Sequence, residues 1–181
     1  MKRIVMATLL LFGACTTGQA NSVGDDAAAG AQSIFLVRHA EKMTGENPSL
    51  TDAGKIRAEA LAARLADAGI THIYSTNTKR TLETAAPISD RTGLEIALYD
   101  AEDLEAFADS LAATSGVHLV VGHSNTTPQL SAALGGDPGS EIDETSEYDR
   151  LYVITYTAGD VSSTIERFGV RYQKSEHADA N

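Results

Sequence analysis

Two hydrophobic runs in this chain of 181 residues each stop at a histidine. The run SIFLVRHA contains Arg38 and His39, and the run VHLVVGHS contains Gly122 and His123. Short runs of Val, Ile, Leu and Phe are typical of buried parallel strands, and ligands bind beyond the carboxyl ends of such strands. If both strands belong to one sheet, both imidazoles lie on the same rim beside Arg38. This combination favours an anion pocket, with a phosphoryl group as its guest, over a metal cage.

Between these runs, strand-like and helix-like segments alternate along the chain. The first predicted helix has a stripe of Ile56, Ala60, Leu61 and Leu65 and ends at Gly69. We predict strands over 34–37, 70–74, 95–99 and 117–121, and helices over 51–68, 78–90, 101–113 and 128–134. This alternation predicts a three-layer α/β/α sandwich around a mostly parallel sheet.

The pattern changes in the last part of the chain. Residues 148–168 read as two strands joined by a hairpin turn at Ala158-Gly159-Asp160. These strands predict an antiparallel edge on the sheet. Before them, Glu147-Tyr148-Asp149-Arg150 is predicted to begin a strand with an ion pair rather than to form an acid site.

The N-terminus has the features of an export signal. Residues 1–15 combine a basic start with a short apolar run and end in Gly-Ala-Cys15, which resembles a bacterial lipobox. We therefore expect an extracytoplasmic, periplasmic or envelope-associated protein that is lipid-anchored at Cys15. The alternative is cleavage after Ala20, which would leave a soluble exported protein. Residues 16–32 are expected to be a flexible tether, 33–172 one folded domain, and 173–181 a disordered tail.

Charge restricts the partners of the chain. The formal net charge of −11 at pH 7 disfavours nucleic acid, because phosphate-backbone affinity depends on clustered Lys and Arg. A phosphate site here must be a local positive focus on a repelling surface, so small substrates are favoured over polyanions. Cys15 is the only cysteine, which excludes an intramolecular disulfide.

Four segments together resemble one known family. Arg38-His39-Ala40-Glu41 is similar to the Arg-His-Gly/Ala-Glu signature of the histidine phosphatase superfamily, the phosphoglycerate mutase-like family. The segments that begin at Leu50-Thr51, at Arg80 and at Gly122-His123 resemble its Leu-Thr-x-x-Gly, Arg-x-x-x-Thr-Ala and second-histidine elements, in the family's order. The resemblance covers about 140 residues and implies the phosphoglycerate mutase-like fold of its small, undecorated members.

The chemistry of phosphoryl transfer assigns roles to these residues. The transferring group keeps its charge on three equatorial oxygens, so it needs an in-line nucleophile and cationic donors around it. His39 is the expected nucleophile, with one nitrogen attacking while the other N–H is held. Arg38 and Arg80 are expected to bind the phosphate, and His123 to add a further donor if it is protonated. Asn125 is expected to orient phosphate or water. No metal or other cofactor is expected.

The proton donor is less well defined. In the resembled family it lies in the loop that here reads Leu98-Tyr99-Asp100-Ala101-Glu102-Asp103, where spacing favours Asp100, with Glu102 as the second candidate. Glu41 and Glu147 stay open as further alternatives. His72 and His118 are expected to be packing or surface residues.

These features predict an exported phosphatase that hydrolyses phosphomonoesters through a phosphohistidine on His39. Two alternatives stay open: a phosphomutase of the same family, and a lipoprotein that binds phosphate without turnover. Sugar phosphates, nucleotides and phosphates of envelope glycans are the expected substrate classes.

Overall fold

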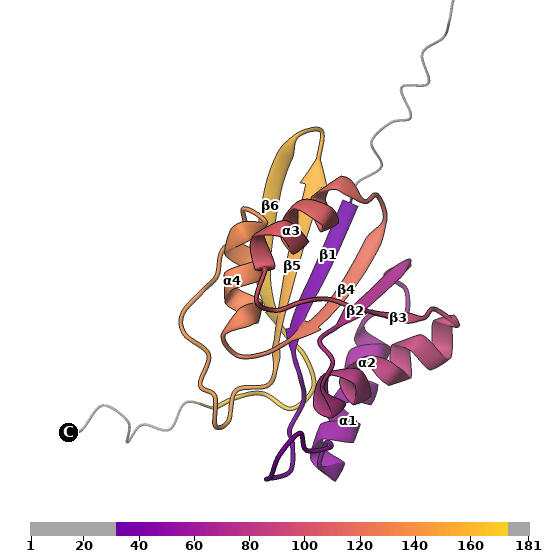
Figure 1. Cartoon of the computed structure of the whole chain (residues 1–181), viewed down its shortest axis with the longest axis vertical. Coiled ribbons are helices and arrows are strands. Elements are labelled where there is room, and N and C mark those ends of the chain that lie inside the picture. Colours follow the sequence, from indigo (N-terminus) through magenta and orange to yellow (C-terminus); the bar gives the residue numbers. More distant parts are fainter. Residues whose placement is uncertain (1–31, 174–181) are drawn as a thin grey trace, which may run out of the picture.

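A six-stranded sheet forms the centre of the computed structural model, which describes residues 32–173 (Figure 1). Its strand order is β3-β2-β4-β1-β5-β6. The strands are β1 Gln32–Arg38, β2 His72–Ser75, β3 Ile96–Leu98, β4 Val117–Gly122, β5 Arg150–Thr157 and β6 Asp160–Arg167. The helices are α1 Asp52–Arg64, α2 Lys79–Thr92, α3 Leu104–Ala113 and α4 Thr126–Ala133.

The sheet is parallel except at one edge. β1 pairs in parallel with β4, which pairs in parallel with β2, and β3 pairs in parallel with β2. β5 pairs antiparallel with β1, and β6 antiparallel with β5. The predicted mostly parallel sheet with an antiparallel edge is therefore confirmed.

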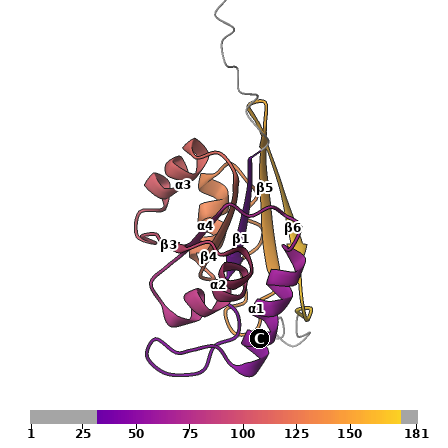
Figure 2. The ribbon, with the colours of Figure 1, turned by 90° about the vertical axis from the view of Figure 1, so that its right-hand side faces the viewer.

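Alternating side chains of β1 define the two cores. Ile34 and Leu36 contribute to a cluster with residues of α3 and α4, whereas Phe35 and Val37 contribute to a cluster with residues of α1 and α2. Figure 2 shows α3 and α4 on the opposite side of the sheet from α1. The sheet is thus covered on both faces, as a parallel sheet requires.

The element boundaries differ from the prediction in a few places. β1 starts at Gln32, which the tether was expected to include, and α4 starts at Thr126, two residues early. The predicted stripe of α1 is wrong at Ile56, whose side chain is 67% exposed. Ile56 precedes the buried Leu61 by five positions, which turns it about 140° around the helix and away from the sheet.

Several predictions lie outside the described residues. The signal at 1–15, Cys15, nearly all of the tether and residues 174–181 of the tail belong to this group, so these interpretations stay predictions. Over residues 32–173, no helix has both the length and the apolar character needed to cross a bilayer.

Candidate active site

The two predicted histidines meet at one rim of the sheet. Arg38 and Gly122 are register partners at the carboxyl ends of β1 and β4, and the His39 N–H donates to the Gly122 carbonyl at 2.9 Å. The residues that follow are therefore neighbours. The His39 and His123 rings lie 5.6 Å apart, centroid to centroid, at 68°.

His39 has the state that a nucleophile needs. Its Nδ1 lies 2.8 Å from the Ala40 carbonyl oxygen, which only accepts, so Nδ1 carries the proton and Nε2 keeps its lone pair. Burial is the main cause that lowers the pKa of His39 to about 3, and Arg38, Arg80 and His123 lower it further. The ring is therefore neutral near pH 7.

Two motif elements hold the His39 segment in place. The Ala40 N–H donates to Thr84 Oγ1 at 3.0 Å, and the Thr84 hydroxyl donates to the Arg80 carbonyl at 2.7 Å. This threonine thus ties helix α2 to the nucleophile. On the other side, a Cβ at Gly54 would lie 2.1 Å from the Glu41 carbonyl oxygen, so only glycine permits this close approach of α1.

His123 lies between an arginine and a threonine. Its Nδ1 is 3.3 Å from Arg80 Nη2, and its Nε2 is 2.9 Å from Thr76 Oγ1. Burial first, and then Arg80 and Arg38, lower the pKa of His123 to about 4. His123 is therefore neutral near pH 7 in this structure, and the additional donor expected from the sequence requires an anion that raises this pKa.

Arg38 is 2% exposed and is held by the backbone of a distant turn. Its Nη1 donates to the carbonyls of Asp143 (3.2 Å) and Glu147 (3.0 Å), and its Nη2 donates to the carbonyl of Glu144 (2.6 Å). The ring of Tyr148 lies 4.1 Å from its Cζ. The sequence predicted that the Arg38 guanidinium binds phosphate. In the structure, three of its N–H groups hold the side chain in place through the backbone carbonyls of this turn.

The remaining donors define the anion site. Arg38 Nε and Arg80 Nε are both buried and lack a hydrogen-bond partner among the described residues. A guanidinium N–H can only donate, and a buried donor without a partner is costly. A tetrahedral oxyanion between the arginines and His39 would satisfy both groups.

The favoured proton donor makes a local hydrogen bond rather than one to the histidines of the site. Asp100 is exposed, and its Oδ1 accepts from the Glu102 N–H at 2.9 Å. No hydrogen bond within residues 32–173 links it to His39 or His123. Its role as acid therefore stays a prediction.

The other acid candidates differ in their pairing. Glu41 forms an ion pair with Arg57 at 2.7 Å. Glu147 is buried between Arg150 and Arg167, each at 2.6 Å, so the ion pair predicted at the start of β5 is confirmed. Both carboxylates support the fold.

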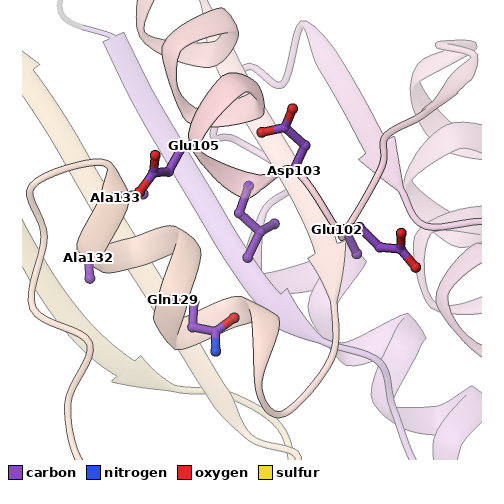
Figure 3. A pocket seen from close by; sticks show the side chains of 8 residues that line it. Glu102, Asp103, Glu105, Gln129, Ala132 and Ala133 are labelled. Atoms are coloured by element: carbon purple, nitrogen blue, oxygen red, sulfur yellow. The ribbon is translucent and has the colours of Figure 1, made fainter.

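Glu102 lines a hollow of about 600 Å³ between α3 and α4. Figure 3 shows Glu102, Asp103 and Glu105 around it, with Gln129 on α4. Neither histidine of the site lines it, and its acidic walls would repel a dianion. Asn125, just before α4, is exposed and makes no capping hydrogen bond, so its expected contact with phosphate or water also stays a prediction.

Sequence reasoning missed two neighbours of the site. Tyr148 covers Arg38, and its ring lies 6.1 Å from the His39 ring. Thr76 contacts His123 directly. Thr76 follows β2 at the same rim as the histidines, and that position was the available signal. Nothing in the local sequence marks Tyr148.

The described residues offer no alternative metal centre. Within 32–173, no group of three or more His, Cys, Asp or Glu side chains could hold a metal ion. The expectation of a reaction without a metal stays a prediction.

Comparison with known proteins identifies a family that part of the chain resembles. Residues 34–104 match the sequence model of the histidine phosphatase superfamily, branch 1. This segment of the chain is similar to the histidine phosphatase superfamily. The match includes Arg38, His39 and Arg80, whereas His123 and Tyr148 lie beyond it and are placed by the fold.

Relatives of this superfamily share either local sequence or the fold. Over 71 residues, the chain is 38% identical to a candidate phosphoglycerate mutase, GpmB, of Yersinia enterocolitica. This match covers 35% of the chain and 33% of that relative, so the chain spans about a third of the relative's length.

Solved structures match most of the chain at low identity. A candidate phosphohistidine phosphatase, SixA, of Agrobacterium tumefaciens is 20% identical, with 77% of this chain and 98% of that chain covered and a TM-score of 0.60. A phosphoserine phosphatase of Entamoeba histolytica in complex with 3-phosphoglyceric acid is 14% identical, with 77% and 98% covered and a TM-score of 0.55. At these identities the likeness shows the fold alone.

Proposed function

We propose that this protein is a phosphatase that hydrolyses small phosphomonoesters through a phosphohistidine on His39. One observation carries the proposal. A neutral imidazole with its Nδ1–H held by Ala40 shares a rim with two arginines, each with a buried, unpartnered Nε–H. A nucleophile beside fixed cationic donors is the arrangement that phosphoryl transfer needs.

The reaction follows from these positions in two steps. The lone pair of His39 Nε2 attacks phosphorus, the ester P–O bond breaks, and the leaving oxygen takes a proton. A water molecule then attacks phosphorus, the N–P bond breaks, and orthophosphate departs. Arg38 and Arg80 stabilise the charge on the equatorial oxygens in both steps. Asp100, with Glu102 as the alternative, is the proposed donor to the leaving oxygen.

Small substrates suit this site better than polyanions. The net charge of −11 repels extended anions, and within residues 32–173 the buried cationic donors that lack a partner are Arg38 Nε and Arg80 Nε. Known members of the fold include proteins named for small phosphorylated substrates, such as a mycobacterial glucosyl-3-phosphoglycerate phosphatase. Sugar phosphates, nucleotides and phosphates of envelope glycans are the proposed classes, with no metal required.

The nucleophile is tested by trapping the intermediate. His39→Gln is expected to lower the turnover of p-nitrophenyl phosphate about 10⁴-fold or more and to abolish the phosphoprotein. Mass spectrometry after an alkaline quench detects the acid-labile phosphohistidine. His72→Gln, which changes a histidine at the other end of the sheet, should keep both signals. A phosphoprotein that persists in His39→Gln excludes this nucleophile.

The same preparation separates a phosphatase from a mutase, which the name of the Yersinia relative makes the main alternative. A phosphatase releases orthophosphate from p-nitrophenyl phosphate without a second sugar phosphate. A mutase keeps its phosphoprotein until a phosphorylated acceptor is added. Binding of orthophosphate without any turnover would instead indicate a phosphate-binding lipoprotein.

We also propose that the protein acts outside the cytoplasm, with a lipid anchor at Cys15. The basic start, the short apolar run and the Gly-Ala-Cys sequence support this proposal. Cys15→Ser is expected to move the protein from the membrane fraction to the soluble fraction of a bacterial host. Wild-type protein found soluble outside the cytoplasm would favour cleavage after Ala20, and retention inside the cytoplasm would reject export.

A further inference from the structure

A chain of buried hydroxyl groups leads away from His123. His123 Nε2 lies 2.9 Å from Thr76 Oγ1, which lies 3.1 Å from Thr81 Oγ1. The Thr81 hydroxyl donates to the Thr76 carbonyl at 2.9 Å. Thr76 is 5% exposed and Thr81 is fully buried. The Nε2 side of the His123 ring is therefore held by buried hydroxyl groups of the protein.

The two ends of this chain fix the direction of every hydrogen bond in it. Arg80 Nη2 can only donate, so at 3.3 Å it makes His123 Nδ1 the acceptor. A neutral ring must then carry its proton on Nε2 and donate it to Thr76 Oγ1. Thr76 donates onward to Thr81, and the chain ends on a carbonyl oxygen, which can only accept.

We propose that Thr76 is a positioning residue that holds His123 as the Nε2-protonated tautomer, so that Nδ1 can take up a proton when a phosphoryl dianion binds. The first part concerns the resting protein, and the second rests on the proposed function. On binding, Nδ1 gains a proton from solvent or from a monoanionic ester. The Arg80 Nη2–H turns from Nδ1 to the phosphoryl group, the new Nδ1–H donates to a phosphoryl oxygen, and Nε2–H stays on Thr76.

The groups that face His123 make an anion the required trigger. Arg80 approaches from α2, Arg38 and His39 from the end of β1, and the two arginines lower the pKa of His123. The hydroxyl of Tyr99 lies 2.8 Å from the position that a Cβ on Gly122 would take. Burial raises the pKa of Tyr99 to about 12, so its phenol is neutral. Within residues 32–173, no carboxylate is hydrogen-bonded to His123.

Thr76 stabilises the charged ring more than the neutral one. A hydrogen bond to a charged group is stronger than one to a neutral group, by an amount that corresponds to roughly one pH unit in the pKa of the ring. Without the hydroxyl, the pKa of His123 in the phosphate complex should fall by that amount. The form with protonated His123 is the active one. When the pKa of His123 falls, the ring loses its proton at a lower pH, and activity is lost there too.

Three variants test this prediction in the kcat profile for p-nitrophenyl phosphate. Thr76→Val should move the alkaline limb of the profile about one pH unit lower. Thr76→Ser keeps a hydroxyl and should restore the limb. Thr78→Val is the matched control, because Thr78 joins the same network through Thr81 and, within residues 32–173, has no hydrogen bond to His123. An alkaline limb that stays in place in folded, active Thr76→Val overturns the proposal.

Nitrogen NMR of the His123 ring gives a readout that needs no turnover. Nitrogen-15 shifts at pH 7 should report Nε2–H in the wild type and Thr76→Ser, and a smaller share of this tautomer in Thr76→Val, where only Arg80 still favours it. Added inorganic phosphate should protonate Nδ1 in the wild type. An Nδ1-protonated resting ring, or no uptake with bound phosphate, contradicts the inference. The expected shifts in a protein without turnover would leave the positioning intact and reject only the proposed function.

Discussion

Two pairs of histidines meet in this protein, one at each end of the sheet. His39 and His123 follow the carboxyl ends of β1 and β4, with ring centroids 5.6 Å apart. His72 and His118 lie near the other end, are register partners of β2 and β4, and stack at 4.8 Å and 14°. Burial is the main cause that lowers the pKa of both His39 and His118. Proximity and burial alone therefore do not distinguish a site from a packing contact.

The unsatisfied atoms around each pair make the distinction. Beside His39, the orphaned atoms are Nε–H donors of Arg38 and Arg80, which an anion can satisfy. At the other end, the orphaned atom is Nδ1 of His118, whose Nε2 donates to the Thr114 carbonyl at 2.9 Å. That Nδ1 is a lone pair, which repels an anion. The histidines are alike, and their neighbours decide the chemistry.

Removing Arg80 should cause the largest loss of activity of the changes compared between the two ends of the sheet. Arg80→Ala is expected to lower kcat/KM for p-nitrophenyl phosphate about 10²–10³-fold, because it removes a fixed cationic donor from the transition state. Arg64→Ala removes an arginine from an exposed ion pair with Glu166 and should leave the rate unchanged. Equal rates in both variants would show that the unpartnered Nε–H of Arg80 plays no part in catalysis.

The sequence predicted the site as far as local patterns reach. Strand ends carry Arg38 and His39 to the same rim as His123, because parallel strands align their carboxyl ends. The ion pair of Glu147 with Arg150 was also predictable, since the residues are three apart.

What the sequence did not predict depends on long-range contacts and on backbone atoms. The turn that holds Arg38 begins at Asp143, 105 residues later in the chain, and it holds the guanidinium through carbonyl oxygens that every residue possesses. Glu147 stabilises this turn by accepting from the Asp143 N–H and by pairing with the distant Arg167. Only the folded chain reveals that a buried charge cluster supports the arginine beside the nucleophile.

The end of the sheet that carries His39 and His123 should also make the free energy of unfolding depend on pH. Unfolded histidine takes up a proton near pH 6.5, whereas burial and the arginines hold the pKa of His39 near 3 and that of His123 near 4. Between the folded and unfolded pKa values, the unfolded state binds more protons than the folded state. The contribution of these two histidines to the free energy of unfolding is therefore complete above pH 6.5 and is lost as the pH falls. Each group contributes a slope of at most about 1.4 kcal/mol per pH unit.

Urea unfolding at pH 7.5, 6.5 and 5.5 measures this slope. His39→Gln removes one of the two groups, so its free energy of unfolding should fall less steeply than that of the wild type. Carboxylates elsewhere titrate equally in both proteins, and the difference between the curves isolates His39. Parallel curves would mean that folding does not lower the pKa of His39, which would contradict the assignment of His39 as a buried, neutral imidazole.

The smallest expected effect separates the two pairs at a single pH. His118→Gln should lower the free energy of unfolding by about 1–2 kcal/mol, because it breaks the stack with His72 and leaves the buried site less well packed. Its kcat/KM should equal that of the wild type. His123→Gln should show the opposite pattern, with lost activity and a smaller change in stability, because it relieves an imidazole buried beside two arginines. Urea unfolding and p-nitrophenyl phosphate turnover at pH 7.5 measure both quantities. Loss of activity in His118→Gln would show that the two ends of the sheet are coupled, and the division between a catalytic and a packing pair would then fail.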